Sequence, residues 1–259
     1  MMKMEKEEIR KIVHLLYELM KKNELTKFKD SLLKNLEKGR TGKLKIVKTP
    51  ILNSIGKELG KLIAKEYWKF ERLLKLWKLS FKNAERLEYG LTTGREVRHV
   101  VINALGEISK RDYENSKKFM LDILSDLSDW ETVDTLALRV VVNLAKQNRE
   151  EVFLLLREWT NSKNKWIRRL AMATIAPYIR AKPGEVKLCL EVIEKLMREK
   201  DRDVKKAVAW ALREISKKNP KVVYEFLQRH IASKDENTKW IVKEGSKKLP
   251  ENLKKKLSY

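Results

Sequence analysis

An indole and a carboxylate one helical turn apart are the first candidates for chemistry in this sequence. The segment SDWETVDTLA is typical of the start of an amphipathic helix, and Asp134 falls one turn after Trp130, close to the apolar stripe. A partly buried aspartate is costly unless another group interacts with it. Asp129 is the better candidate for a helix cap, because it directly precedes Trp130. The pattern therefore favours a functional Asp134 over a satisfied polar residue of the core.

A second tryptophan and a series of cations follow further along the chain. Trp210 lies in KKAVAWALREISKKNP, and core packing is its alternative role. Any single lysine is often solvated surface, but cations that recur on successive helices predict a stripe suited to a phosphate backbone. The recurring cations are Lys165, Arg168, Arg169, Lys205, Lys206, Arg213, Lys239, Lys243 and Lys247.

Other kinds of chemistry find little support. Cys189 is the only cysteine and lies in an apolar run, which favours burial over catalysis and fits a reducing compartment. The three histidines are far apart, so no zinc motif is formed. The sequence has no glycine loop for phosphates and no nucleophile elbow. We therefore predict neither a metal nor another cofactor.

The charge balance indicates the class of partner. The chain has 59 Lys and Arg against 36 Asp and Glu, a net charge of +23. A body with this excess attracts a polyanion, most commonly nucleic acid, while a membrane surface is the lesser alternative. Heat adaptation usually raises Lys and Glu together and would not leave this excess. A charged N-terminus and the lack of a run of about 20 apolar residues predict a cytoplasmic, nucleoid-associated protein without a membrane span.

Nearly every segment that could position these residues has helical spacing. With only 9 Gly and 5 Pro, turns are few, and the fold class predicted is all-α. Helices are expected to begin near Trp130, Trp166, Val204 and Trp240, at spacings of 36, 38 and 36 residues. A second apolar run follows each of the first three, at 152–156, 186–196 and 222–227, and 95–108 with 116–127 forms one more pair.

Such a repeated helix pair is typical of an α-solenoid of HEAT-like, armadillo-type units, with a concave basic groove. We expect a single domain over residues 1–259, in which 1–94 are N-terminal helices, 95–250 are HEAT-like repeats and 251–259 are a basic tail. When the repeats are aligned on their expected first residues, Asp134 shares a column with Leu170, Val208 and Glu244. The carboxylate thus stands where two sister repeats have an aliphatic residue.

These residues together resemble the DNA alkylation repair family with HEAT-like repeats, the AlkD-type alkylpurine DNA glycosylases. The similar elements occur in the same order over about residues 30–250. They are Lys48-Thr-Pro50, Trp130-Glu-Thr-Val-Asp134, Trp166-Ile-Arg-Arg169 and Lys205-Lys-Ala-Val-Ala-Trp-Ala-Leu-Arg-Glu214, with Ser216-Lys and Pro220 following. One departure is Asp129, because members of the family often have a second aromatic residue before the tryptophan.

The resemblance implies a role for each candidate residue. Asp134 would be the catalytic carboxylate, Trp130 and Trp210 the aromatic walls around the damaged nucleotide, and Arg169 a DNA contact near the lesion. An N3- or N7-alkylated purine is already cationic and leaves without protonation, so the enzyme must stabilise positive charge, which a carboxylate and tryptophan faces can do. Most glycosylases flip the base into a pocket. The resemblance implies a different arrangement here, an open groove that leaves the lesion stacked.

Three functions remain open at this point. The first is a monomeric glycosylase that removes alkylated purines from double-stranded DNA. The second is a non-catalytic HEAT-repeat protein that binds bent, damaged or branched DNA, because the fold alone does not establish activity. The third is a scaffold whose basic surface meets an acidic protein.

Overall fold

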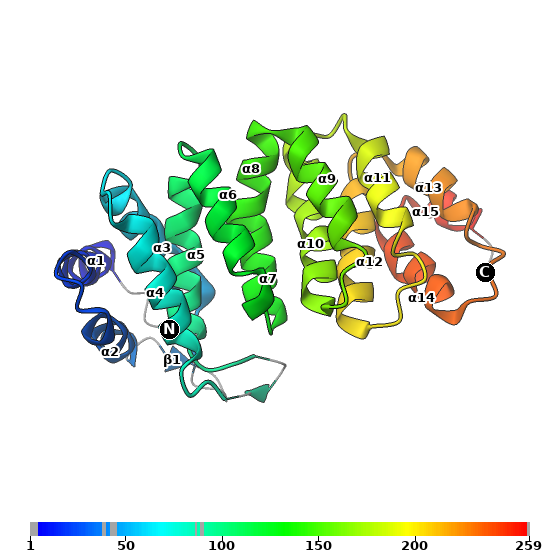
Figure 1. Ribbon diagram of the computed structural model, residues 1–259. Coiled ribbons are helices and arrows are strands. Elements are labelled where there is room, and N and C mark those ends of the chain that lie inside the picture. Colours follow the sequence, from blue (N-terminus) through cyan, green and yellow to red (C-terminus); the bar gives the residue numbers. More distant parts are fainter. Residues whose placement is uncertain (1–4, 38–39, 42–45, 86, 89–90, 258–259) are drawn as a thin grey trace. The chain divides into compact units, whose positions relative to one another are not determined.

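The chain folds almost entirely into helices (Figure 1). The computed structural model describes residues 5–37, 40–41, 46–85, 87–88 and 91–257. The chain divides into two compact units, residues 1–144 and residues 145–259, and helix α8 (Val142–Gln147) leads from the first into the second. The predicted all-α class is confirmed, while the prediction of a single domain stays a prediction.

The first unit contains two rows of helices and one short hairpin. The row α1, α3, α5 and α7 packs in sequence order, α7 continues into η4, and α2, α4 and α6 form the second row. The helices are α1 (Lys6–Lys21), α2 (Leu25–Leu36), α3 (Thr49–Ile63), α4 (Lys69–Phe81), α5 (Arg95–Ile108), α6 (Tyr113–Asp122), the 3₁₀ turn η3 (Leu124–Asp126), α7 (Trp130–Leu136) and the π-helix η4 (Ala137–Val141). The hairpin pairs β1 (Arg40–Thr41) antiparallel with β2 (Ile46–Val47).

Close packing of α3 against α5 depends on two glycines of α3. A Cβ on Gly56 would lie 2.6 Å from the carbonyl oxygen of Val100, and one on Gly60 would lie 2.6 Å from that of Ala104. Small residues are expected where helix backbones approach this closely. As a result, the polar side chains at the start of α3 are brought against those of α5.

The second unit repeats a helix pair three times. Helices α10 (Lys165–Ala181), α12 (Arg202–Ser216) and α14 (Glu236–Gly245) pack in a row, and α9 (Arg149–Trp159), α11 (Val186–Glu194) and α13 (Pro220–Gln228) pack against that row (Figure 1). The end of the chain predicted as a basic tail contains α15 (Glu251–Lys254), which packs on α13, and Leu257 is buried. The 3₁₀ turn η5 (Ser246–Lys248) closes α14.

Side-chain caps set the register of the repeats. Asp129, Asn164, Asp201 and Asp235 each directly precede a helix and accept a hydrogen bond from a backbone N–H of its first turn. The repeat helices therefore begin at Trp130, Lys165, Arg202 and Glu236, close to the predicted starts except that Trp240 lies five residues into α14.

This register corrects the expected alignment of Asp134. Counted from the caps, the fifth residue of each repeat helix is Asp134, Arg169, Lys206 or Trp240. Leu170 and Val208 are fully buried, whereas Asp134 is only half-buried. The carboxylate thus lies in a column of polar and aromatic side chains, and its placement in the aliphatic column was wrong.

Candidate functional site

Helix α7 carries Trp130 and Asp134 on its partly exposed side. Trp130 opens the helix and is 36% exposed, and Asp134 is half-buried, whereas Val133 and Leu136 are fully buried. Residues four apart in a helix are neighbours on its surface. The structure therefore brings this aromatic ring and this carboxylate onto the same side of α7.

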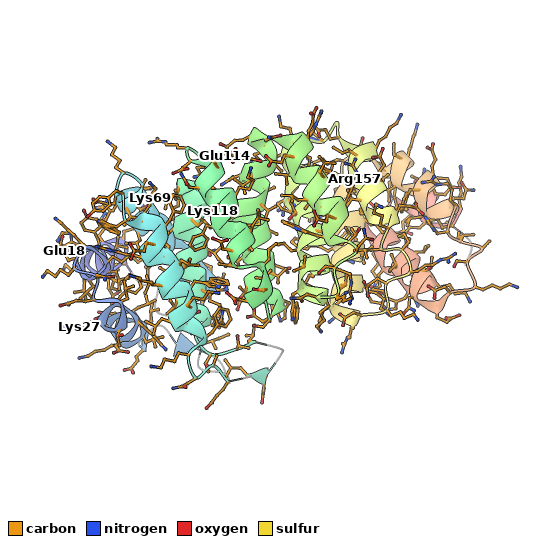
Figure 2. All side chains as sticks on the ribbon, in the orientation of Figure 1. Glu18, Lys27, Lys69, Glu114, Lys118 and Arg157 are labelled. Atoms are coloured by element: carbon orange, nitrogen blue, oxygen red, sulfur yellow. The ribbon has the colours of Figure 1, made fainter. Side chains whose placement is uncertain are left out.

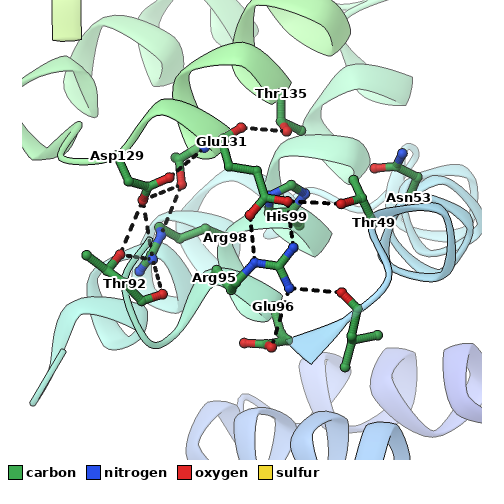
Figure 3. A network of polar contacts seen from close by, with 12 residues as sticks. Thr49, Asn53, Thr92, Arg95, Glu96, Arg98, His99, Asp129, Glu131 and Thr135 are labelled. Carbon is green, nitrogen blue, oxygen red and sulfur yellow. Dashed lines mark hydrogen bonds and ion pairs between the residues drawn. The ribbon is translucent and has the colours of Figure 1, made fainter. Parts of the chain in front are cut away.

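The N-terminus of α7 is fixed by its cap. Asp129 accepts hydrogen bonds from the backbone N–H and the hydroxyl of Thr132, both at 2.8 Å, which confirms the predicted cap. Its other contacts are to Thr92, in the segment before α5, and to Arg98 in α5 itself. The Thr92 hydroxyl donates to Asp129 Oδ2 at 3.2 Å, and Arg98 Nη2 lies 3.6 Å from the same oxygen (Figure 3). The side chains of Asp129 and Arg98 are both fully buried.

A second buried ion pair holds α7 two residues further on, at Glu131. Arg95 donates to both carboxylate oxygens of Glu131, from Nη2 at 2.6 Å and from Nε at 2.7 Å (Figure 3). Arg95 also donates to the carbonyl oxygen of Val47 at 3.0 Å, and the Thr49 hydroxyl donates to Glu131 at 2.9 Å. The Lys48-Thr-Pro50 element, α5 and α7 are thereby joined at one carboxylate. We call Arg95, Arg98, His99, Asp129 and Glu131 the α7 clamp.

Glu131 is ionised within this clamp. Burial alone would raise the pKa of Glu131, but its interactions with His99 and Arg95 outweigh burial and hold the pKa well below its ordinary value. His99 is fully buried, and its Nε2 lies 3.6 Å from Glu131 Oε2, which is longer than a hydrogen bond. Neither ring nitrogen of His99 has a hydrogen-bond partner among the described residues.

Arg169 and Trp210 lie in the second unit. Arg169 is on the first turns of α10, is only 7% exposed, and donates to the carbonyl oxygen of Asp203 at 2.5 Å. Trp210 is half-buried in the middle of α12. The candidate residues thus divide between the units, with Trp130 and Asp134 in the first and the other candidates in the second.

Several of the predicted DNA-binding cations already have partners within the chain. Arg168 donates to both carboxylate oxygens of Glu199, at 2.7 and 3.2 Å, and to the carbonyl oxygen of Ser162 at 2.8 Å. Lys165 lies 2.8 Å from Asp203. Burial lowers the pKa of Lys165, but its pairing with Asp203 and Asp201 outweighs this and raises it. These contacts bind one repeat to the next.

The three predicted cations of α12 differ in how available they are. Lys205 donates to the Asn237 side chain at 2.9 Å, and Arg213 donates to the carbonyl oxygen of Glu244 at 3.2 Å. Lys206 is exposed, and it has no ion pair with any residue in the described part of the chain. Among the three, Lys206 is therefore the side chain most available to a phosphate.

Metal and thiol chemistry find no support in the described residues. No three His, Cys, Asp or Glu side chains in that part of the chain are grouped to hold a metal ion. Cys189 is fully buried, and burial raises its pKa to about 12, which keeps the thiol protonated. None of the described helices has the length and apolar character to cross a membrane.

The α7 clamp was not among the sites predicted from the sequence. Its signal was present in REVRH at the start of α5, where two arginines and a histidine stand in a helix whose residues 95–106 are all buried. Charged residues are rarely fully buried unless they are paired. The carboxylates that pair with these arginines are Asp129 and Glu131, at the start of α7.

Solved structures of similar fold include proteins of DNA repair. A protein of Enterococcus faecalis, reported as a predicted DNA alkylation repair enzyme, is 19% identical over 79% of this chain and 87% of its own, with a TM-score of 0.60. The alkylpurine DNA glycosylase AlkC of Pseudomonas fluorescens, bound to DNA containing an abasic site analog, is 17% identical over 92% of this chain and 61% of its own, with a TM-score of 0.54. AlkD2 of Streptococcus mutans is 24% identical over 75% of this chain and 99% of its own, with a TM-score of 0.48.

A match to a family model over most of the sequence shows the family of this chain. No curated protein matches the chain significantly. The family model described as DNA alkylation repair enzyme matches residues 47–249, more than three quarters of the 259 residues. The match begins at β2, directly before the Thr49 that donates to Glu131, and includes α7, α10 and α12. The chain therefore belongs to the DNA alkylation repair enzyme family.

Proposed function

We propose that this chain is a monofunctional DNA glycosylase that hydrolyses the N-glycosidic bond of N3- or N7-alkylated purines in double-stranded DNA. The observation that carries the proposal is the half-buried carboxylate of Asp134, one turn from the exposed ring of Trp130, on a helix held by two buried ion pairs. Membership of the family supports it, as does the shared fold with AlkC, an alkylpurine DNA glycosylase.

The chemistry requires stabilisation of positive charge. Alkylation at N3 or N7 makes the purine a cationic leaving group, and the sugar becomes oxocarbenium-like as the bond breaks. In the proposal, Asp134 stabilises that charge and positions the attacking water. Trp130 and Trp210 attract the cation with their ring faces, at about 0.5–2 kcal/mol each. The lesion stays stacked, so no pocket for a flipped base is needed.

The proposal assigns DNA contacts to the cations of the second unit. Arg169 is proposed to contact the strand near the lesion, with Lys206 as the most exposed phosphate contact. Lys165, Arg168, Lys205 and Arg213 already have intramolecular partners, so their contribution is to shape the surface and add positive potential. The protein is proposed to act as a monomer without a metal or other cofactor.

The direct test is release of free base from methylated duplex DNA. The wild type is expected to release 3-methyladenine or 7-methylguanine, Asp134→Asn to release none, and both to bind DNA with similar affinity. Asp122→Asn is the matched control, because Asp122 is an exposed aspartate at the end of α6 in the same unit. Thermal melts establish that all three proteins fold. Excision by Asp134→Asn at the wild-type rate would contradict the role of this carboxylate.

A non-catalytic DNA-binding protein is the second candidate. It is favoured by Asp129, which stands where members of the family often have a second aromatic residue and which is here a buried helix cap. Binding of duplex DNA by a folded wild type that releases no alkylated base would support this candidate. Binding that does not weaken with salt would contradict both, since phosphate contacts give a log–log slope of about −0.9 each.

A further inference from the structure

The first unit has a small, positively charged pocket between α3, α5 and the junction of η4 with α8. Its volume is about 270 Å³, and its lining carries three cations, Lys57, Lys110 and Arg139, against a single carboxylate, Glu107. A water occupies about 30 Å³ of liquid. The pocket therefore has room for a phosphate group together with several waters.

Two of the three cations are available to a ligand. Lys57 and Arg139 are exposed, and neither has an ion pair within the described residues. Lys110 lies 2.6 Å from Glu107, so the carboxylate is already neutralised by its own neighbour on α5. The pocket is left with two uncompensated positive charges on two different structural elements.

Arg139 is held at the edge of the pocket by packing. The Asn143 side chain donates to the carbonyl oxygens of Gly106, at 2.9 Å, and of Arg139, at 2.8 Å, and thereby ties α5 to η4. A Cβ on Gly106 would lie 2.9 Å from the Arg139 carbonyl oxygen, so a larger residue would force the two helices apart. The backbone of Arg139 belongs to a π-helix, a feature frequent at functional sites.

The floor of the pocket adds a neutral donor. Asn103 is buried and donates to the side-chain oxygen of Asn53 at 2.9 Å and to the carbonyl oxygen of His99 at 2.8 Å. The oxygen of Asn53 is thus occupied, and its amide N–H groups remain as donors beside the two cations. The hydrogen bond from Asn103 to the His99 carbonyl oxygen connects the lining of the pocket to the α7 clamp, and Figure 3 shows Asn53 and Thr49 on the same side of that clamp.

We infer that this pocket binds a phosphate of the DNA backbone near the nucleotide that faces Asp134. Leu138 lines the pocket and follows Asp134 by four residues, about one turn along the continuous segment α7–η4. Cations and amide donors without a free carboxylate suit a phosphate monoanion. The inference rests on the proposed function, and it gives the first unit its own contact with the strand.

The test is the salt dependence of binding to an undamaged duplex, which needs no catalysis. Full-length wild type, Lys57→Gln, Arg139→Gln and the double variant are compared by fluorescence anisotropy between about 50 and 200 mM salt. Lys118→Gln is the matched control. Lys118 is an exposed lysine of α6, away from the pocket, with no ion pair to any described residue (Figure 2).

Loss of one phosphate contact should reduce the magnitude of the log–log slope by about 0.9 in the double variant, with a smaller reduction in each single variant. Lys118→Gln should keep the wild-type slope. Pocket variants that keep the wild-type slope, or a control that loses as much slope as they do, would overturn the inference. A wild type that does not bind DNA would instead overturn the proposed function. If Arg139→Gln melts early, Lys57→Gln alone decides, because the Lys57 side chain is exposed and forms no ion pair with any described residue, so its loss should not affect folding.

Discussion

Replacing Glu131 by glutamine should lower the free energy of unfolding by about 3–5 kcal/mol, the range for breaking a buried ion pair. Glu131 accepts two hydrogen bonds from Arg95 and one from Thr49, and the side chain of Arg95 is 1% exposed. A glutamine side chain keeps one oxygen that can accept from Arg95, but its amide N–H₂ group would face the other N–H group of the Arg95 guanidinium. At least one charge-assisted bond of about 1.5–3 kcal/mol is lost, and the buried Arg95 charge loses its main partner.

The assay is urea unfolding at neutral pH, followed by circular dichroism and extrapolated linearly to water. Glu71→Gln is the matched control, because Glu71 pairs with Lys75 at 2.5 Å but both side chains are more than half exposed. An exposed pair of this kind contributes about 0–1 kcal/mol. The double variant Arg95→Met/Glu131→Met should cost less than the sum of its two single changes, since no buried charge is left unpaired. A cost for Glu131→Gln no larger than for Glu71→Gln, or an additive double variant, would refute the clamp.

Three further predictions concern pH, the basic residues and the exposed indole. The folded-state pKa of Glu131 is held below its unfolded value of about 4.3. The ionised carboxylate therefore contributes its full stabilisation above a pH of about 4.3, and this stabilisation is lost as the pH falls below that value. In Glu131→Gln, the free energy of unfolding measured with urea should depend less on pH over this acidic range. Arg168→Gln should lower the melting temperature, because it leaves the nearly buried Glu199 unpaired, whereas Lys206→Gln should leave stability unchanged and weaken DNA binding; the reverse pattern would contradict the assignment of these roles. Trp130→Ala should slow excision by about 2- to 30-fold, the equivalent of a cation–π contact of about 0.5–2 kcal/mol, and an unchanged single-turnover rate would exclude the ring from the site.

The α7 clamp has a consequence for how activity depends on residues that touch no substrate. Arg95, Arg98 and Thr49 contact the two carboxylates that flank Trp130, and they come from α5 and from the first residue of α3. A shift of about 1 Å in a reacting group is sufficient to reduce catalysis strongly. We therefore expect variants of the clamp that still fold to lose excision more than they lose DNA binding.

Much of the architecture followed from the sequence, because local patterns decide it. Apolar residues at three- and four-residue steps predicted the helices, and the run at 95–108 coincides with α5. Asp129 was predicted as a cap from its place before Trp130, and the structure confirms it. Cap geometry involves only residues two or three apart, so a short stretch of chain is enough to specify it.

The sequence also determined the family of the chain, since the family model matches residues 47–249, and the order and spacing of Trp130, Asp134, Arg169 and Trp210 predicted the same family. It did not fix the register of the repeats to the residue. An alignment on large apolar residues moved Asp134 into an aliphatic column, whereas the caps place it with Arg169 and Lys206.

Only the tertiary structure decided which charges are committed within the protein and which are available to a ligand. Arg168 and Lys206 look equivalent in the sequence, yet one is paired with Glu199 and the other is exposed without an ion pair to any described residue. Arg95 and Glu131 are 36 residues apart, and their pairing depends on how α5 packs against α7. The physical reason is that helix formation depends on neighbours within one turn, while the partner of a side-chain charge is set by packing between helices distant in sequence.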